Sequence, residues 1–189
     1  MPTETPVVLW EVQAMTTPPT KNSDDSNQQQ RPSSVEYSVS GGLAGRLSAL
    51  NASFGLTSYQ SNILYMIGRN RQGGINVHQS IMPRPMGLSV NLTGDIGSGM
   101  TMTAGYQIMR FENVLAADQL AYNLFDKCYA PRVTHVTGAL DAHDVGLDKD
   151  GRPVFVNTRF NGQDVPSEKH YFEEIWRPSI ISEPDDEDS

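Results

Sequence analysis

Residues 141–157, which read DAHDVGLDKDGRPVFVN, contain the feature that most constrains how this chain can fold. Two short apolar runs flank Asp150 and Gly151, and glycine accepts the positive φ that a tight turn between antiparallel strands requires. The runs are rich in β-branched and aromatic residues, which favours strands over a helix. Pro153 has no N–H to donate, so it belongs at the start of the second strand or at a sheet edge. The sequence therefore predicts a β-hairpin here.

The turn of this hairpin also resembles part of a calcium loop, because Asp148 and Asp150 have the spacing of two EF-hand carboxylates. An EF-hand loop needs Asp at its first position and Glu at its twelfth. Gly146 and Asn157 stand at those two positions. We therefore expect a solvated turn and no calcium site.

Short strand-like segments of the same kind fill most of the chain after residue 52. We predict strands at residues 54–59, 62–67, 75–79, 86–90, 100–104, 107–111, 132–136 and 170–176. Residues 41–50 carry leucines at helical spacing, which predicts a short amphipathic helix at one end of the domain. Residues 116–125 are expected to form either a short helix or a long loop. The predicted fold class is all-β.

A weak internal repeat relates these segments. Tyr59 and Tyr106 lie 47 residues apart in similar contexts, and Gly87 and Gly146 lie 59 residues apart in the segments PMGL and DVGL. Strand-rich units of about 40–50 residues are typical of propeller blades. We predict a partial β-propeller-like array of about three four-stranded units. Closed propellers have about four to eight blades, so we expect self-association or a partner chain to complete the array.

The two ends of the chain differ from the middle in composition. Residues 1–35 are rich in Pro, Thr, Ser, Asn and Gln and predict a disordered, low-complexity leader. Residues 183–189 hold five acidic residues and no basic residue, so they form an acidic tail. The domain is assigned to residues 36–182, which hold 12 basic and 13 acidic residues. Without a basic stripe, nucleic-acid binding is not expected.

Location is inferred from what the sequence lacks. No run of 18 apolar residues predicts a membrane span, and the start of the chain has neither the basic residues nor the apolar core of a secretion signal. Cys128 is the single cysteine, so no disulfide can form within one chain. We expect a cytoplasmic protein that does not bind membranes.

Eight short motifs between residues 59 and 158 carry a family resemblance. They are YQ at 59–60, LYMIG at 64–68, RPMGL at 84–88, YQIMRFEN at 106–113, YAPR at 129–132, TG at 137–138, DAHD at 141–144 and GRPVFVNT at 151–158. Together they resemble the uncharacterised bacterial family called domain of unknown function 4915, over about residues 43–182. The resemblance implies a propeller-like, all-β domain and brings no established reaction, cofactor or catalytic residue. Family members continue past Trp176 into further blades, so the resemblance implies a truncated domain.

The strongest candidate for chemistry is the pair His143 and Asp144, the only histidine next to a carboxylate in the sequence. A neutral imidazole beside a carboxylate can act as a base or bind a metal. Together with Asp141, the pair is also our candidate ligand set for a divalent metal. The alternative is structural, in which both side chains form hydrogen bonds with backbone groups between adjacent blades.

Arg84, Arg110 and Arg132 are candidates for binding a small anion if the fold brings them together. Cys128 has no evident activating base nearby, so a nucleophilic role is not expected.

Three functional hypotheses follow. The leading one is a non-enzymatic binding or scaffold module that needs no cofactor. The alternative is a metal-assisted hydrolase of small molecules, of the lactonase type, that uses His143 and Asp144. The third is a fragment of a longer family member with no function of its own.

Overall fold

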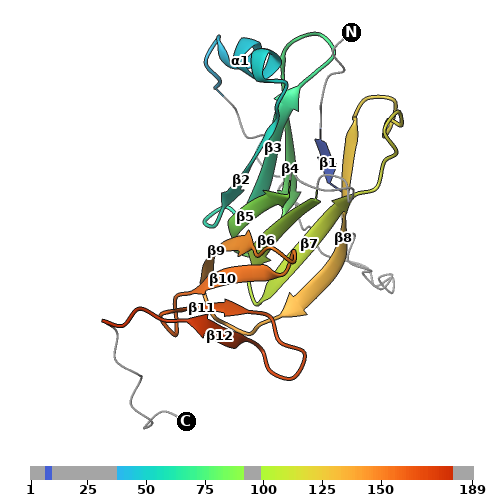
Figure 1. The fold of residues 1–189 in the computed structure, drawn as a ribbon. Helices are drawn as coiled ribbons and strands as arrows, with labels where there is room; N and C mark the ends of the chain where they lie inside the picture. The colour runs from blue at the N-terminus through green and yellow to red at the C-terminus, as the bar shows by residue number, and fades with distance from the viewer. Residues whose placement is uncertain (1–6, 10–37, 92–98, 181–189) are drawn as a thin grey trace, which may run out of the picture.

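A computed structural model describes residues 7–9, 38–91 and 99–180 of the chain. Within these ranges the chain forms three β-sheets and one short helix, α1 (Leu43–Leu50) (Figure 1). The all-β prediction and the predicted helix are confirmed. The predicted acidic tail, and all of the predicted leader except residues 7–9, lie outside the described residues.

The three sheets contain twelve strands in the described part of the chain. The first sheet has the order β2 (Phe54–Ser58), β3 (Ile63–Arg69), β4 (Ile75–Ile81). The second has the order β1 (Val7–Leu9), β8 (Lys127–Val136), β7 (Gln107–Asn113), β6 (Gly99–Ala104), β5 (Pro85–Asn91). The third has the order β12 (Glu173–Trp176), β11 (Gly162–Val165), β10 (Pro153–Asn157), β9 (Ala142–Leu147). All neighbouring strands are antiparallel except β1 and β8, which are parallel.

Several details differ from the sequence-based expectations. The sheets have three, five and four strands, whereas about four were expected in each. Strand β11 was not predicted, β8 begins five residues before the predicted start, and β12 begins after His170. Strand β1 comes from the segment that we predicted to be a disordered leader. Of the two alternatives for residues 116–125, the loop is the one observed, closed by a bridge between Ala121 and Phe125.

The predicted hairpin is present as β9 and β10. Pro153 opens the second strand opposite Leu147, and Gly151 in the turn has a φ of +77°. The Asp148 carboxylate accepts the backbone N–H groups of Asp150 and Arg152, both at 2.9 Å, and pairs with the Arg152 guanidinium at 3.0 Å. The backbone N–H of Arg152 contributes most to lowering the pKa of Asp148. This carboxylate therefore closes the turn.

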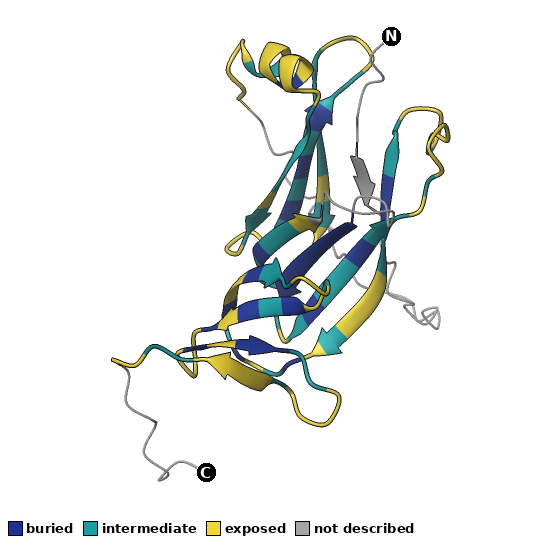
Figure 2. Cartoon of the chain, in the orientation of Figure 1, coloured by how far each residue is buried: buried dark blue, intermediate teal, exposed yellow. Residues whose placement is uncertain are grey.

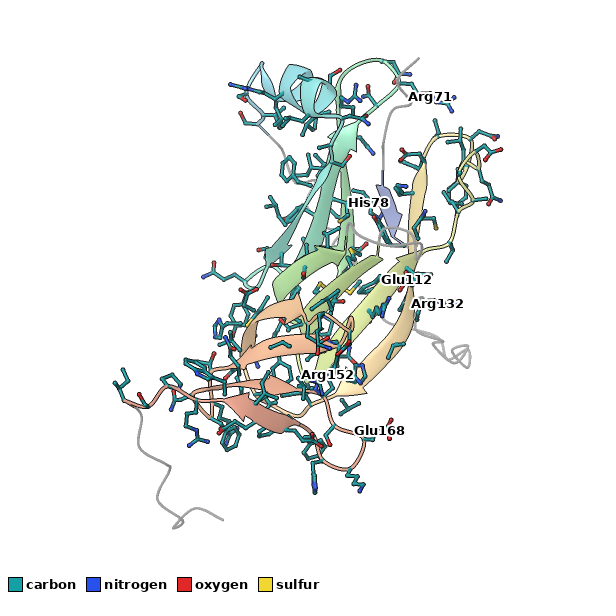
Figure 3. All side chains as sticks on the ribbon, viewed as in Figure 1. Arg71, His78, Glu112, Arg132, Arg152 and Glu168 are labelled. Carbon is teal, nitrogen blue, oxygen red and sulfur yellow. The ribbon has the colours of Figure 1, made fainter. Side chains whose placement is uncertain are left out.

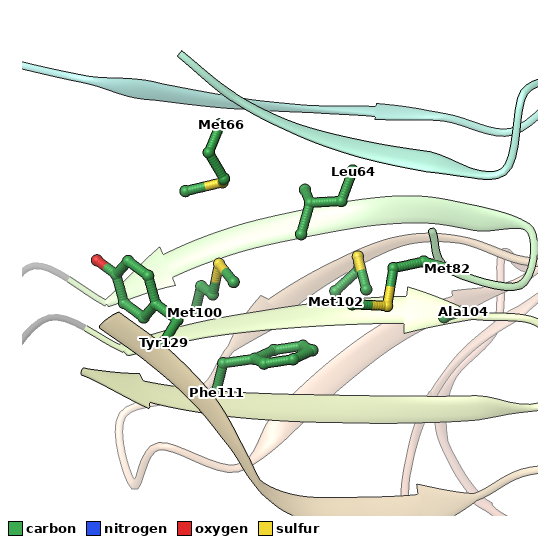
Figure 4. Packing of buried hydrophobic residues seen from close by; sticks show 8 residues of the cluster. All are labelled: Leu64, Met66, Met82, Met100, Met102, Ala104, Phe111 and Tyr129. Carbon is green, nitrogen blue, oxygen red and sulfur yellow. The ribbon is translucent and has the colours of Figure 1, made fainter. Parts of the chain in front are cut away.

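The first and second sheets pack through a cluster rich in methionine (Figure 4). Leu64 and Met66 of β3 face Met100 and Met102 of β6, and all four are at most 7% exposed. Methionine is unbranched and fills irregular gaps between sheets. The strands approach closely at Gly55 of β2, where an added Cβ would lie 2.9 Å from Cδ2 of Leu88.

The second and third sheets are packed even more closely. A Cβ added to Gly87 of β5 would lie 2.6 Å from the Cα of Asp144 in β9, so only glycine fits there. The buried hydroxyl of Thr103 joins the two sheets: it accepts the N–H of Gly87 at 2.8 Å and donates to the carbonyl of Ala142 at 2.6 Å. An apolar cluster completes this junction and consists of Ile108, Leu140, Ala142, Val145 and Phe155.

Strand directions follow from these contacts between sheets. Arg84 lies near Asp141 and Gly87 lies near Asp144, so β5 and β9 run parallel. Gly55 lies near Leu88 and Thr57 donates to the carbonyl of Met86, so β2 runs antiparallel to β5. Figure 2 shows buried residues along the middle of the stack and exposed residues on α1 and β12. The described sheets do not close into a barrel. In the described part of the chain, no helix has the length and hydropathy needed to span a membrane.

Candidate functional site

Three side chains from three sheets meet where β2 ends and where β5 and β9 begin. The Arg84 guanidinium donates from Nη2 to the Asp141 carboxylate at 2.8 Å and to the Tyr59 hydroxyl at 3.0 Å. Its central carbon lies 5.2 Å from the centre of the Tyr59 ring, within the range of a cation–π contact. The backbone N–H of Arg84 also bonds to the side chain of Asn62 at 2.9 Å. This Arg84 cluster holds one end of the sheet array together.

Two of these residues have backbone conformations that no sequence pattern predicts. Arg84 and Asp141 have positive φ angles of 46° and 47°, which are uncommon for residues other than glycine. Each stands directly before an edge strand of its sheet, β5 or β9. Because these two strands are parallel neighbours, their preceding residues lie at the same end of the array. The Arg84–Asp141 ion pair follows from that arrangement.

The Arg84 cluster is open to solvent. The side chains of Arg84 and Asp141 are 41% and 49% exposed. The hydrogen bond with Tyr59 makes the largest contribution to raising the pKa of Arg84, with a smaller one from Asp141. The guanidinium is therefore a fixed cation, and among the described contacts only its Nη2 is used. Its other N–H donors suit a carboxylate or phosphate oxygen.

His143 and Asp144 lie in β9 with exposed side chains. Asp144 accepts the adjacent backbone N–H of Val145 at 2.9 Å, which is a local structural bond. Asp141, our third candidate metal ligand, is paired with Arg84. Among residues 38–91 and 99–180, no group of three or more His, Cys, Asp or Glu side chains is close enough to hold a metal ion. A catalytic role for His143 and Asp144 stays a prediction.

The three candidate arginines have different surroundings. Arg84 lies before β5, whereas Arg110 lies within β7 and pairs with Glu112 at 2.6 Å. Arg132 is exposed on β8, beside a register shift between β7 and β8. In the described contacts, the Arg84 guanidinium bonds to Tyr59 and Asp141, whereas the Arg110 guanidinium bonds to Glu112.

The sequence did not point to a buried polar pair in the third sheet. Asn157 of β10 and Asp164 of β11 are 0% and 1% exposed, and the Asn157 amide donates to Oδ2 of Asp164. Oδ1 of Asp164 has no partner among the described atoms. Burial, the largest cause, raises the pKa of Asp164. The only sequence signal was indirect: Asn157 ends the predicted hairpin, but Asp164 lies in a segment with no clear strand pattern.

Cys128 is a buried free thiol in β8. Burial raises its pKa, which disfavours the reactive thiolate. This agrees with the expectation that Cys128 is not a nucleophile.

Comparison with known proteins gives one family. The family model described as Domain of unknown function (DUF4915) matches residues 42–189, a range that includes β2 to β12. No curated protein and no solved structure matches the chain.

Proposed function

This chain belongs to the family Domain of unknown function (DUF4915), and we propose that it is a propeller-like binding module and not an enzyme. The stacking of meandering sheets supports the propeller-like arrangement, since β5 and β9, edge strands of the second and third sheets, run side by side and parallel. In such arrays, loops that gather at one end of the strands commonly form the ligand site. The Arg84 cluster lies at such an end, where β2 ends and where β5 and β9 begin.

The observation that carries this proposal is the convergence of Tyr59, Arg84 and Asp141 from three sheets. Together they fix a half-exposed guanidinium whose remaining donors point to no described partner. We assign it a small anionic ligand with carboxylate or phosphate oxygens. Asp141 neutralises part of the charge, so it restrains affinity while it orients Arg84.

The proposal is tested by titrating the full chain with inorganic phosphate and with citrate, followed by NMR of the backbone amides. We expect shifts near residues 59, 84 and 141 that saturate in the wild type. Arg84→Gln should lose them, and Asp141→Asn should strengthen binding by removing the competing carboxylate. Arg132→Gln is the matched control, because this exposed arginine lies on β8. Equal binding by the Arg84 and Arg132 variants would overturn the assignment.

No described contact favours the hydrolase alternative over the binding module. A direct test is hydrolysis of lactone substrates by the purified chain with and without added divalent cations. We expect no turnover above buffer. Turnover that is lost in His143→Ala, with folding intact, would replace the binding proposal with the enzymatic one.

We also propose a cytoplasmic location and no binding to nucleic acid. The buried free thiol of Cys128 suits a reducing compartment. A net charge of −8 opposes binding to a polyanion.

A further inference from the structure

The turns around the Arg84 cluster are joined to one another through the backbone. The N–H of Gly105, in the turn from β6 to β7, donates to the carbonyl of Arg84 at 3.4 Å. A Cβ added to Gly105 would lie 3.4 Å from the carbonyl oxygen of Pro83, so these two turns are in close contact. The carbonyl of Tyr106 accepts the N–H of Thr137 at 2.8 Å, in the segment that leads to β9. Tyr106 therefore lies on the same rim of the sheet array as the Arg84 cluster.

Tyr106 presents an exposed ring from a tight turn. Gly105 and Tyr106 stand between the paired residues Ala104 and Gln107, and Gly105 has a φ of 58°. A positive φ at the first position suits a two-residue hairpin turn. Tyr106 is 59% exposed. Because the turn fixes its backbone, only the side-chain torsions of Tyr106 have to be ordered when a ligand binds, so the ring can contact a ligand with little loss of conformational entropy.

Arg84 lies between two turns that each carry a tyrosine. Its guanidinium contacts the ring and the hydroxyl of Tyr59, which is 47% exposed, and its carbonyl contacts the turn that contains Tyr106. A guanidinium binds phosphate or carboxylate oxygens through its edge and stacks on aromatic rings through its face. The surroundings of Arg84 thus combine a fixed cation with aromatic rings from two neighbouring turns. This combination favours a planar ring that carries negative charge over a bare anion.

A second arginine adds positive charge beside the cluster. Arg159 is exposed in the turn from β10 to β11, and its N–H donates to the carbonyl of Leu140 at 3.3 Å. Its guanidinium lies 3.5 Å from the carbonyl oxygen of Ala139. Both contacts are made to residues just before Asp141. Arg84 and Arg159 outnumber this one carboxylate, so the three side chains carry net positive charge although the chain as a whole has a net charge of −8.

From these observations we propose that the Arg84 cluster binds an aromatic ring that carries a phosphate or carboxylate group. This inference rests on the proposed function, because it names the class of the small anion that was assigned to Arg84. The anionic group takes donors of the Arg84 guanidinium other than Nη2, and the ring packs against Tyr106. Arg159 contributes through its charge and needs no direct contact with the ligand.

The first test compares matched ligands by isothermal titration calorimetry on the full 189-residue chain. Phenyl phosphate and cyclohexyl phosphate carry the same charge and have nearly the same bulk, but only the first has an aromatic ring. Benzoate and cyclohexanecarboxylate form the equivalent pair of carboxylates. We expect the aromatic member of each pair to bind about 2–10-fold more tightly, the usual effect of one aromatic contact. Inorganic phosphate should bind more weakly than phenyl phosphate, and Arg84→Gln should remove the binding of every probe.

Variants of Tyr106 then locate the ring of the ligand. Tyr106→Ala should remove the preference for phenyl phosphate over cyclohexyl phosphate, and Tyr106→Phe should keep it, because the ring and not the hydroxyl makes the contact. Tyr122→Ala is the control and should also keep the preference. Tyr122 is 77% exposed in the loop after β7, beyond the end of β7 near which Glu112 lies (Figure 3). Circular dichroism and a cooperative melt show that each variant folds, and the comparison of ligands on the wild type depends on no variant.

The outcomes separate this inference from the proposed function. If inorganic phosphate binds in an Arg84-dependent way but the wild type shows no preference for the aromatic ligands, only the inference about the ring is overturned. A preference that survives in folded Tyr106→Ala also overturns it. If no anion binds, or if binding persists in Arg84→Gln, the proposed function itself fails.

Discussion

Gly87 and Gly146 occupy the same kind of place in two successive sheets, yet their surroundings are opposite. Gly87 lies against the backbone of β9, where a single added carbon would collide with the neighbouring sheet. Gly146 faces open space. Within one chain, glycine is required by packing at the first position and not at the second. The covered and open faces of similar sheets can therefore be told apart by the free-energy cost of adding a methyl group.

The largest contrast is expected between two consecutive residues of β10. Phe155 is 1% exposed and packs against the second sheet, whereas Val156 is 38% exposed on the open face. Phe155→Ala should lower the free energy of unfolding by about 3–5 kcal/mol because it leaves a cavity. Val156→Ala should change it by less than about 1 kcal/mol. Urea denaturation of dilute protein measures both, and equal losses would mean that the open face is covered within the chain.

The glycines themselves give the next largest effect. Gly87→Ala should destabilise the fold by about 1–3 kcal/mol, since β9 must move away from the added carbon. Gly146→Ala should stabilise a single chain by roughly 0.5–1 kcal/mol, because alanine loses less conformational freedom in a strand. Thermal melts of the two variants at low concentration are the measurement. Destabilisation of both to the same extent would remove the distinction between the covered and open faces.

A smaller effect is expected from removing the two hydrogen bonds that the Thr103 hydroxyl forms between the second and third sheets. Thr103→Val keeps the shape of the side chain but removes the hydroxyl that joins Gly87 to Ala142. We expect a loss of about 1–2 kcal/mol in the free energy of unfolding. Thr134→Val, at an exposed position of β8, should be nearly neutral. A similarly small change in both variants would show that apolar packing alone holds the second and third sheets together.

The smallest expected effect concerns pH and the buried Asp164. Its pKa in the folded chain is raised above the ordinary value of 3.8, so the folded state holds this proton more tightly than the unfolded state does. Its contribution to stability is fully present below the unfolded pKa and is lost as pH rises through the folded pKa. Asp164→Asn should therefore gain stability over the wild type at pH 7 and lose that advantage near pH 3. Asp150→Asn, in the exposed turn, is the control. Parallel pH profiles for wild type and Asp164→Asn would contradict the shift.

Local signals made much of the fold predictable. The hairpin of β9 and β10 was found because Asp150 and Gly151 specify a tight turn and Pro153 specifies a strand start. Strand β11 was missed because its segment, GQDV, has one apolar residue, and its buried Asp164 depends on Asn157 in the neighbouring strand. The first half of β8 was missed because Pro131 interrupts it, and the register shift beside Pro131 accommodates that residue.

The Arg84 cluster was only half predictable. Arg84 and Asp141 were both chosen as candidates, but for different sites. Their contact joins residues 57 positions apart and depends on the parallel approach of β5 and β9. No local pattern specifies which strands of separate sheets lie side by side. For the same reason, the sequence shows the motif that contains Gly87 but not the close approach of Gly87 to β9.

Apart from β1, each sheet is built from strands that follow one another directly along the chain. Among the described strands, none of one sheet lies between strands of another, so apart from β1 the hydrogen-bonded ladder of each sheet can form from a continuous stretch of sequence. Such a stack is modular, because a whole sheet could be gained or lost by duplication or deletion of one gene segment without changing the strand pairing of the other sheets. Evolution of this architecture would then proceed in steps of one sheet, and Gly146, where an added Cβ meets no described atom within 4 Å, marks a face of the third sheet against which a further sheet could pack.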